Sequence, residues 1–299
     1  QYTASVILKS SNPLQAIAAT DRDGDGIPEL VVGGDGLTLL KRNKTGGYDK
    51  SPINWALKLP TNSSNNNNNE QHITSADING DGLLDLVVSL FSCQATAQVL
   101  QVFINRGGQT YEEQSVALGL GLQASAWATV ATDYNGDGRM DLLVLTESCA
   151  PNTGVALFLG QPDGKGGQSP APRYKLAQQD GIFNAPTGPP KGSPMGAAAT
   201  DVNGDGVLDY LLAEIELRDF EQFGSSVTSL DPLNPALHNQ VSNVYLLSQP
   251  TGKRTRAGLE AGLWAPVSTT SKTMVAWSPM WADLDHDGRL ELLYVGSGD

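Results

Sequence analysis

Residues 133–141 read Asp133-Tyr134-Asn135-Gly136-Asp137-Gly138-Arg139-Met140-Asp141, and apolar runs at 127–132 and 142–146 flank them. Side-chain oxygens stand at positions 1, 3, 5 and 9 of this segment. Because Ca²⁺ takes six to eight oxygen ligands, alternate side chains of such a loop can surround one ion. We expect a further ligand from the backbone carbonyl at position 7, and a positive φ at the glycine of position 6. The segment therefore predicts a calcium-binding loop between two strands.

The same pattern occurs five times, always with Gly at position 6. The side chains predicted to bind metal at positions 1, 3, 5 and 9 are Asp21, Asp23, Asp25 and Glu29; Asp77, Asn79, Asp81 and Asp85; Asp133, Asn135, Asp137 and Asp141; Asp201, Asn203, Asp205 and Asp209; and Asp283, Asp285, Asp287 and Glu291. The predicted carbonyl ligands at position 7 belong to Ile27, Leu83, Arg139, Val207 and Arg289. A unit that recurs with variable insertions indicates a repeat architecture.

An EF-hand is excluded by the residue at position 12 of each loop. An EF-hand loop carries a bidentate Glu there, whereas this chain has Val32, Val88, Val144, Leu212 and Tyr294. The apolar runs around each loop are also of strand length, and turn residues bound them.

Four such runs make up each complete repeat. We predict first strands at 16–20, 73–76, 127–132, 197–200 and 279–282, and second strands at 30–32, 86–90, 142–145, 210–213 and 292–295. Third strands are predicted at 37–40, 99–104, 155–159 and 244–247, and fourth strands at 55–59, 113–117, 174–176 and 264–267. The first strands are rich in Ala, Ser and Thr, which suits the crowded innermost strand of a propeller blade.

The fold class predicted from these runs is all-β, a β-propeller of four-stranded blades. Residues 1–299 would form one propeller domain with four complete blades and half of a fifth, incomplete at its C-terminus. The run at 2–8 would be an outer strand of the last blade. Two alternatives stay open: a ring of five blades, or a part of a larger, seven-bladed ring.

The repeated pattern D-x-[DN]-x-[DN]-G-x-x-[DE] between apolar strands resembles the FG-GAP/VCBS repeats of the integrin α-subunit β-propeller and its relatives. The resemblance extends over essentially the whole chain and rests on the metal motif. It agrees with Ca²⁺ as the cofactor, about one ion per loop, and it implies an extracellular, integrin-like role in adhesion.

Charge and composition narrow the class of partner. The formal net charge is −13, and more than half of the 32 acidic residues lie in the five loops. Such acidity argues against nucleic acid or an anionic membrane surface as partner, and no apolar run is long enough to span a membrane. Sequons at 43–45 and 62–64, together with the calcium motifs, predict a secreted glycoprotein or the ectodomain of a surface protein. The start at Gln1 suggests a processed or trimmed chain, and whether it is part of a longer polypeptide stays open.

A ligand face is predicted opposite the loops, at the entry of each first strand. The residues six positions before each loop are Gln15, Gln71, Trp127, Met195 and Trp277. The two Trp side chains would either form an apolar rim for a sugar or peptide or pack inside the central channel, and we favour packing. The insertion at 214–240 on the same face is long enough for a binding loop. Cys93 and Cys149 hold equivalent places in neighbouring repeats, and whether they are bonded stays open.

No catalytic residues are predicted, because no nucleophile–His arrangement, phosphate-binding loop or zinc site is evident in the sequence. The favoured hypothesis is an extracellular, calcium-stabilised propeller that binds a protein or a glycan. The alternatives are a calcium-dependent, lyase-like enzyme that degrades polysaccharide, and a scaffold domain of a longer receptor.

Overall fold

The structure is a computed structural model that describes residues 8–9, 14–34, 36–51, 71–91, 99–107, 110–121, 126–146, 154–162, 174–177, 193–215, 244–248, 254–256 and 275–297. The chain forms two compact units. Unit 1 comprises residues 1–144 and 157–176, and unit 2 comprises residues 145–156 and 177–299. All the regular elements described are β-strands, as the sequence predicts.

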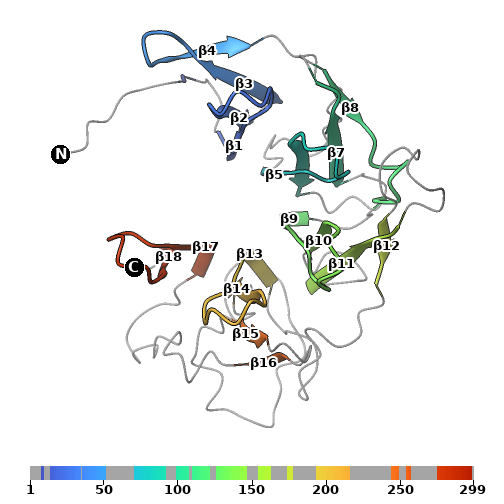
Figure 1. Cartoon of the computed structure of the whole chain (residues 1–299), viewed down its shortest axis with the longest axis vertical. Coiled ribbons are helices and arrows are strands. Elements are labelled where there is room, and N and C mark those ends of the chain that lie inside the picture. Colours follow the sequence, from blue (N-terminus) through green and yellow to red (C-terminus); the bar gives the residue numbers. More distant parts are fainter. Residues whose placement is uncertain are drawn as a thin grey trace, which may run out of the picture. The chain divides into compact units, whose positions relative to one another are not determined.

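Three four-stranded antiparallel sheets belong mainly to unit 1 (Figure 1). They are formed by β1 (Ala16–Thr20), β2 (Glu29–Gly33), β3 (Leu37–Arg42) and β4 (Tyr48–Ser51); by β5 (Gln71–Ala76), β6 (Asp85–Leu90), β7 (Leu100–Asn105) and β8 (Tyr111–Glu113); and by β9 (Ala126–Thr132), β10 (Asp141–Thr146), β11 (Gly154–Gly160) and β12 (Tyr174–Leu176). In each sheet the strands are paired in chain order, as in a propeller blade.

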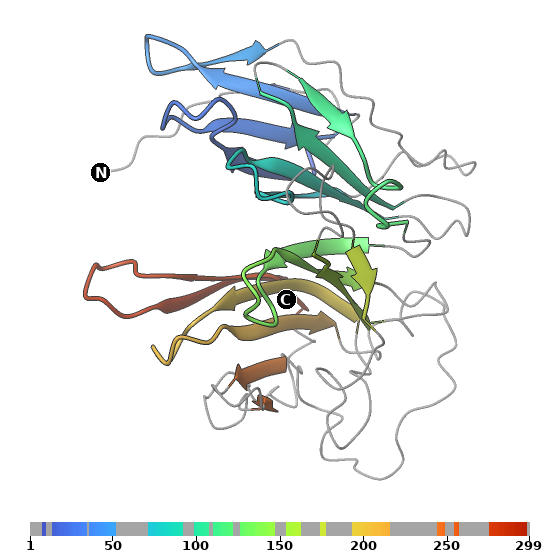
Figure 2. The same ribbon diagram turned by 45° about the vertical axis from the view of Figure 1, so that its right-hand side comes forward.

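Unit 2 contains one four-stranded sheet and one hairpin. The sheet consists of β13 (Ser193–Thr200), β14 (Asp209–Ile215), β15 (Val244–Ser248) and β16 (Arg254–Arg256), and the hairpin consists of β17 (Val275–Ala282) and β18 (Glu291–Ser297). Figure 2 shows the hairpin as a long red ribbon that ends in the fifth acidic loop. Four complete blades and the first half of a fifth are therefore present, as predicted.

The first strands of neighbouring blades lie side by side. In unit 1, β1 contacts β5 and β5 contacts β9, and in unit 2, β13 contacts β17. Thr74 on β5 donates its hydroxyl to the carbonyl of Thr129 on β9 at 2.6 Å. This bond joins the first strands of blades 2 and 3 directly.

The middle strands form the core. Every residue of β6, β7 and β10 is buried. A strand that is buried on both faces carries a continuous apolar run instead of an alternating pattern, which explains why these strands were the clearest in the sequence.

Three predicted fourth strands differ from the structure. In blade 1 the strand is β4 at 48–51, not 55–59; in blade 2 it is β8 at 111–113, earlier than 113–117; and in blade 4 it is β16 at 254–256, not 264–267. The predicted runs at 55–59 and 264–267 lie outside the described residues. The prediction for β12 at 174–176 is confirmed.

A tight turn explains the error in blade 1. The Oδ1 atom of Asn43 accepts hydrogen bonds from the N–H groups of Thr45 (3.1 Å) and Gly47 (2.9 Å), and Gly46 has a φ of 85°. The turn returns the chain at once, so β4 pairs beside β3. Because β4 is the outermost strand and reads Tyr-Asp-Lys-Ser, it carries no apolar signal. The same Asn43 belongs to one of the two sequons, and glycosylation there stays a prediction.

Several further predictions lie outside the described residues. These are the strand at 2–8 apart from its last residue, the sequon at 62–64, Cys93 and Cys149, and the insertion beyond residue 215. Among the residues that are described, no helix is long and apolar enough to cross a membrane.

Candidate metal loops

Five acidic loops connect the first and second strands of the blades. We number them loop 1 (21–29), loop 2 (77–85), loop 3 (133–141), loop 4 (201–209) and loop 5 (283–291). The strand register fixes where each loop closes: Thr20 pairs with Glu29, Ala76 with Asp85, Thr200 with Asp209 and Ala282 with Glu291. The residue at position 9 is thus held opposite the residue that precedes position 1, and the acidic side chains are gathered in one tight turn.

The aspartate at position 1 organises every loop. Its Oδ2 atom accepts a hydrogen bond of 2.8–3.0 Å from the N–H of the glycine at position 6. In loops 2 to 5 its Oδ1 atom also accepts the N–H of position 5, at 3.0–3.1 Å. In loops 2 to 5 both oxygens therefore face the inside of the turn.

Positions 3 and 5 are held in the same way. In loops 2 to 5 the Oδ1 atom at position 3 accepts the N–H of position 5 at 2.9–3.1 Å. In all five loops the Oδ1 atom at position 5 accepts the N–H of position 7 at 2.8–3.0 Å. In these bonds each side chain at position 3 or 5 uses only its Oδ1 atom. The second carboxylate oxygen of each Asp, or the amide nitrogen of each Asn, does not take part in them. The carbonyl of position 7 as a metal ligand stays a prediction.

The acid at position 9 is the buried member of each set in loops 1 to 4. Glu29, Asp85, Asp141 and Asp209 are at most 1% exposed, and in all five loops the N–H of position 2 donates to the position 9 carboxylate at 2.7–3.1 Å. Burial raises the pKa of Asp85 to about 7 and raises the pKa of Asp141 as well. A bound cation would oppose this effect, because it stabilises the ionised carboxylate.

In blades 2 and 3 the position 9 carboxylate also holds the third strand. The Oδ1 atom of Asp85 accepts the N–H of Asn105 at the end of β7, and the Oδ1 atom of Asp141 accepts the N–H of Gly160 at the end of β11, both at 2.7 Å. One carboxylate thus ties the loop, the second strand and the third strand together. This role was not evident from the sequence, because the partner N–H groups belong to residues distant in the chain.

Two backbone positions in each loop are left-handed. The glycines at position 6 have φ values of 79–86°, as predicted. Position 4 is also left-handed: Gly24, Gly80, Gly136 and Gly204 have φ values of 71–74°, and His286 takes this place in loop 5 with a φ of 60°. The second requirement was missed, although Gly at position 4 in four of the five copies was its signal.

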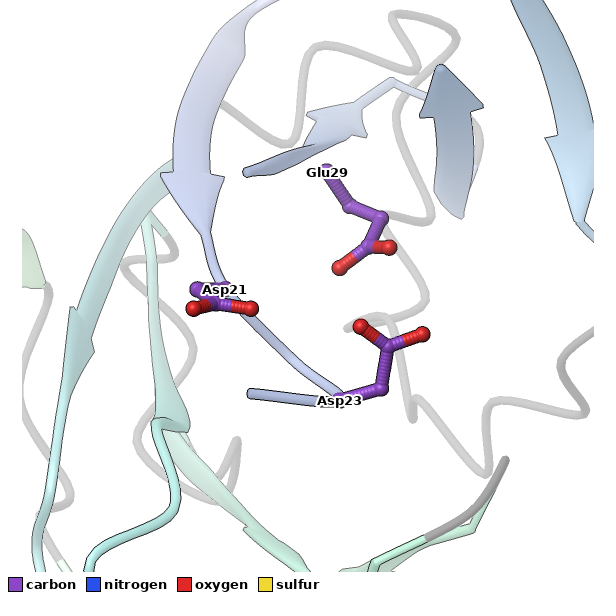
Figure 3. Close-up of side chains that lie close together, drawn as sticks. All are labelled: Asp21, Asp23 and Glu29. Carbon is purple, nitrogen blue, oxygen red and sulfur yellow. The ribbon is translucent and has the colours of Figure 1, made fainter. Parts of the chain in front are cut away.

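Carboxylates converge most closely in loops 1 and 5, where position 3 is Asp and position 9 is Glu. Oxygens of Asp21, Asp23 and Glu29 lie within 4.8 Å of one another, and so do oxygens of Asp283, Asp285 and Glu291. Figure 3 shows the Asp23 and Glu29 carboxylates turned toward each other, with Asp21 beside them at the end of β1.

These groups fit a hard divalent cation. The donors are carboxylate and amide oxygens without sulfur or imidazole, which are the ligands that Ca²⁺ prefers. In loop 1 the Oδ1 atom of Asp21 is buried and has no hydrogen-bond donor among the described residues. A buried anionic oxygen without a donor is costly, and a metal ion would satisfy it. The acidic groups of the loops can therefore bind a metal ion.

Basic side chains reach two of the loops. In loop 3 the Arg139 guanidinium pairs with Asp137, and its Nε donates to the carbonyl of Gly160 at 2.9 Å. In loop 1 the Nζ atom of Lys41 on β3 lies 2.5 Å from Asp23, 3.3 Å from Glu29 and 3.8 Å from Asp25. The hydrogen bond from Lys41 lowers the pKa of Asp23, and the same bond raises the pKa of Lys41.

The residues of the predicted ligand face stand at the entries of the first strands. Gln71 pairs with Leu90, and the Gln15 N–H donates to the carbonyl of Gly33 at 3.0 Å. Met195 and Trp277 both lie at register shifts, in β13 and β17 respectively. These positions therefore lie near the start of each first strand, but their pairing with the second strand differs among the blades.

Trp127 is the one aromatic residue of this set whose side chain is described. Its ring stacks on Phe91, with a centroid distance of 4.4 Å and an interplanar angle of 25°. The side chain is only partly buried. This contact accords with the packing role that the sequence favours, and ligand binding by this face stays a prediction.

Comparison with known proteins identifies the repeats. A family model described as an FG-GAP-like repeat matches residues 21–88 and 90–144, which contain loops 1 to 3. No curated protein matches the chain.

Among solved structures, the chain is similar to an Agrocybe aegerita lectin, whose structure is described as the basis of specific recognition of non-reducing terminal N-acetylglucosamine. The two are 18% identical with a TM-score of 0.37, and the match covers 65% of this chain and 47% of the lectin chain. This chain therefore matches less than half of the lectin's length. The family match shows FG-GAP-like repeats in residues 21–88 and 90–144, and the four-stranded antiparallel sheets show the blades of a β-propeller.

Proposed function

We propose that this chain is a calcium-stabilised propeller that acts outside the cell as a non-catalytic binding module for a protein or a glycan. The observation that carries the calcium role is the repetition of one loop geometry. Five loops place acidic oxygens at the same backbone positions and hold them with the same hydrogen bonds from the backbone.

The ions would be structural in this proposal. Each loop joins the first strand of its blade to the second strand. The position 9 acid is buried beneath the turn in loops 1 to 4. A cation there would offset the repulsion among three or four carboxylates and fix the blade's inner hairpin. Calcium is abundant outside the cell, which supports a secreted protein or an ectodomain. FG-GAP repeats are typical of extracellular proteins, and the match over 21–144 agrees with this location.

Binding and catalysis are separated by one experiment on the whole chain. The protein is incubated with a panel of acidic and neutral polysaccharides, in calcium and in EDTA, and both retention on the polysaccharide and its chain length are measured. We expect calcium-dependent retention of one class without shortening, and Trp127→Ala tests whether the ring that stacks on Phe91 also contributes to retention. A Val116→Ala variant is the control, because Val116 is 73% exposed and lies outside the first strands.

Each other result has a defined meaning. Shortened polysaccharide would contradict the non-catalytic proposal and favour the lyase-like alternative. Equal retention in calcium and EDTA would contradict the calcium role. If no polysaccharide is retained, glycan binding is excluded for the panel and a protein becomes the partner to test, with the insertion after β14 as the first segment to delete.

A further inference from the structure

Lys41 stands where blades 2 and 4 have an apolar residue. In blades 1, 2 and 4 the residue after position 9 is Leu30, Leu86 or Tyr210, and it pairs with Leu40, Phe103 or Leu246 of the third strand. The next residues of those third strands are Lys41, Ile104 and Leu247. The register therefore places a lysine opposite the position 9 acid of loop 1 and an aliphatic residue opposite this acid in loops 2 and 4.

The Lys41 ammonium lies among the predicted metal ligands. Its Nζ atom is within 4 Å of three of the four acids of loop 1, namely Asp23, Asp25 and Glu29. Arg139, by comparison, pairs with a single acid of loop 3, Asp137. Lys41 is the only cation described that contacts three acids of one loop.

Loop 1 also lacks hydrogen bonds that the other loops share. In loops 2 to 5 the N–H of position 5 donates to the acid at position 1 and to the side chain at position 3. In the described part of loop 1, Asp23 instead accepts hydrogen bonds from Lys41 at 2.5 Å and from the Arg22 guanidinium at 3.5 Å, and Asp21 keeps only the bond from Gly26. The position 3 side chain is thus oriented by basic side chains, with Lys41 at the shorter distance, and not by the loop backbone.

We propose that Lys41 is a tethered cation that competes with the metal ion for loop 1, so that this loop binds divalent cations more weakly than loops 2 to 5. The inference rests on the proposed calcium role. A calcium ion at about 2.3–2.6 Å from the oxygens of Asp23 and Glu29 would lie only a few ångströms from the ammonium. At that separation two positive charges repel strongly in a partly enclosed site, so the ion must displace the lysine before it binds.

If Lys41 served only to balance the charge of loop 1, it would not weaken the binding of a cation there. Loop 1 carries four acids and Arg22, so its own net charge already equals that of loops 2 and 4, which carry three acids and no base, and it leaves no additional charge for Lys41 to balance. If Lys41 only corrected the charge, it could lie outside the turn. Instead it contacts the oxygens that an ion needs. Competition therefore predicts a weak site in spite of the additional carboxylate.

The test counts ions on the whole chain. Calcium binding to the metal-free protein is followed by equilibrium dialysis and by native mass spectrometry for the wild type, Lys41→Met and Lys41→Gln. We expect one site to bind at least about tenfold more tightly in both variants, and this gain to disappear in Lys41→Met combined with Asp21→Asn. Lys50→Met is the control for the lost charge, because Lys50 is exposed on β4 of the same blade.

The outcomes separate the two proposals. Calcium bound with the same stoichiometry and affinities by the wild type and both Lys41 variants would overturn the role of Lys41 and leave the calcium function intact. The same gain in Lys50→Met would also overturn it, since net charge would then be the cause. If neither the wild type nor any variant binds calcium, the proposed function itself fails, and the inference fails with it.

Discussion

Glycine at position 6 of each loop is needed for its left-handed backbone conformation and not for space, because no atom lies close to where a Cβ would be. At Gly138 the φ is 81°, and a Cβ atom would have no neighbour within 4 Å. An alanine there costs about 1–2 kcal/mol, because an L-residue in the left-handed region is strained. We expect Gly138→Ala to lower the melting temperature of the protein.

The matched control is Gly121→Ala. Gly121 also has no atom within 4 Å of a Cβ, but its φ lies outside the left-handed region. Thermal melts of both variants separate backbone strain from the loss of glycine itself. Equal melting temperatures for the two variants would contradict the prediction.

His72 predicts a pH dependence. Burial lowers the pKa of its imidazole from 6.5 to about 4, and the Thr129 N–H donates to its Nδ1 atom at 3.5 Å, which requires the neutral ring on that side. Because the folded pKa is below the unfolded value, this group's contribution to stability is complete above pH 6.5. It decreases as the pH falls toward 4, by at most about 3 kcal/mol.

The measurement compares the wild type with His72→Asn from pH 4 to 7. Buried Asp85 has a raised pKa and contributes in the opposite direction over this range, so the difference between the two proteins isolates the histidine. We expect the stability of the wild type relative to the variant to fall as the pH decreases. A difference that is constant with pH would count against a partly buried, neutral His72.

At the scale of the element, we expect Asp141 to stabilise its blade whether or not a metal ion is bound. Its carboxylate accepts the N–H groups of Tyr134 and Gly160 and is fully buried. Asp141→Ala leaves two N–H groups without acceptors, at roughly 2–4 kcal/mol in total. We expect this loss of stability in denaturant unfolding even in EDTA.

Asn135→Ala is the comparison within the same loop. Asn135 is exposed, and its Oδ1 atom accepts one backbone N–H. Its removal should cost little in EDTA and more in calcium, where it would be a metal ligand. If Asp141→Ala were silent in EDTA, its buried hydrogen bonds would not be structural.

The inner strands and their loops were predictable because their sequence pattern has few alternative explanations. Buried strands such as β6 and β10 read as continuous apolar runs, and the acidic loops repeat five times. The outer strands β4 and β16 were not predictable from apolar runs, since their residues are largely polar, and the place of β4 depends on the turn at 43–47.

Within the candidate site, the sequence predicted which residues meet but not what else they contact. Lys41 lies on the third strand and reaches loop 1 only through the strand register. The bonds from Asn105 and Gly160 to the buried acids have the same origin. Contacts between distant segments need the fold, and a repeat motif alone does not reveal them.

The whole chain carries a net charge of −13, and its acidic residues are concentrated in the five loops. Loops 1 to 3 belong to unit 1, and loops 4 and 5 belong to unit 2. Without cations, repulsion inside each loop opposes folding. One site filled at a hundredfold excess of ligand over Kd stabilises a protein by about 2.7 kcal/mol, and independent sites add. We therefore expect the melting temperature to rise steadily with calcium concentration and to fall substantially in EDTA.

Salt and magnesium provide the controls. Sodium chloride at matched ionic strength screens the loop charges but cannot coordinate their oxygens, so it should restore only a small part of the stability. Magnesium should also restore less than calcium, because it demands near-ideal octahedral geometry and gives up its water reluctantly. Melts that are unchanged by EDTA would contradict structural calcium. Full rescue by sodium chloride would mean that charge screening, and not coordination, is what the loops require.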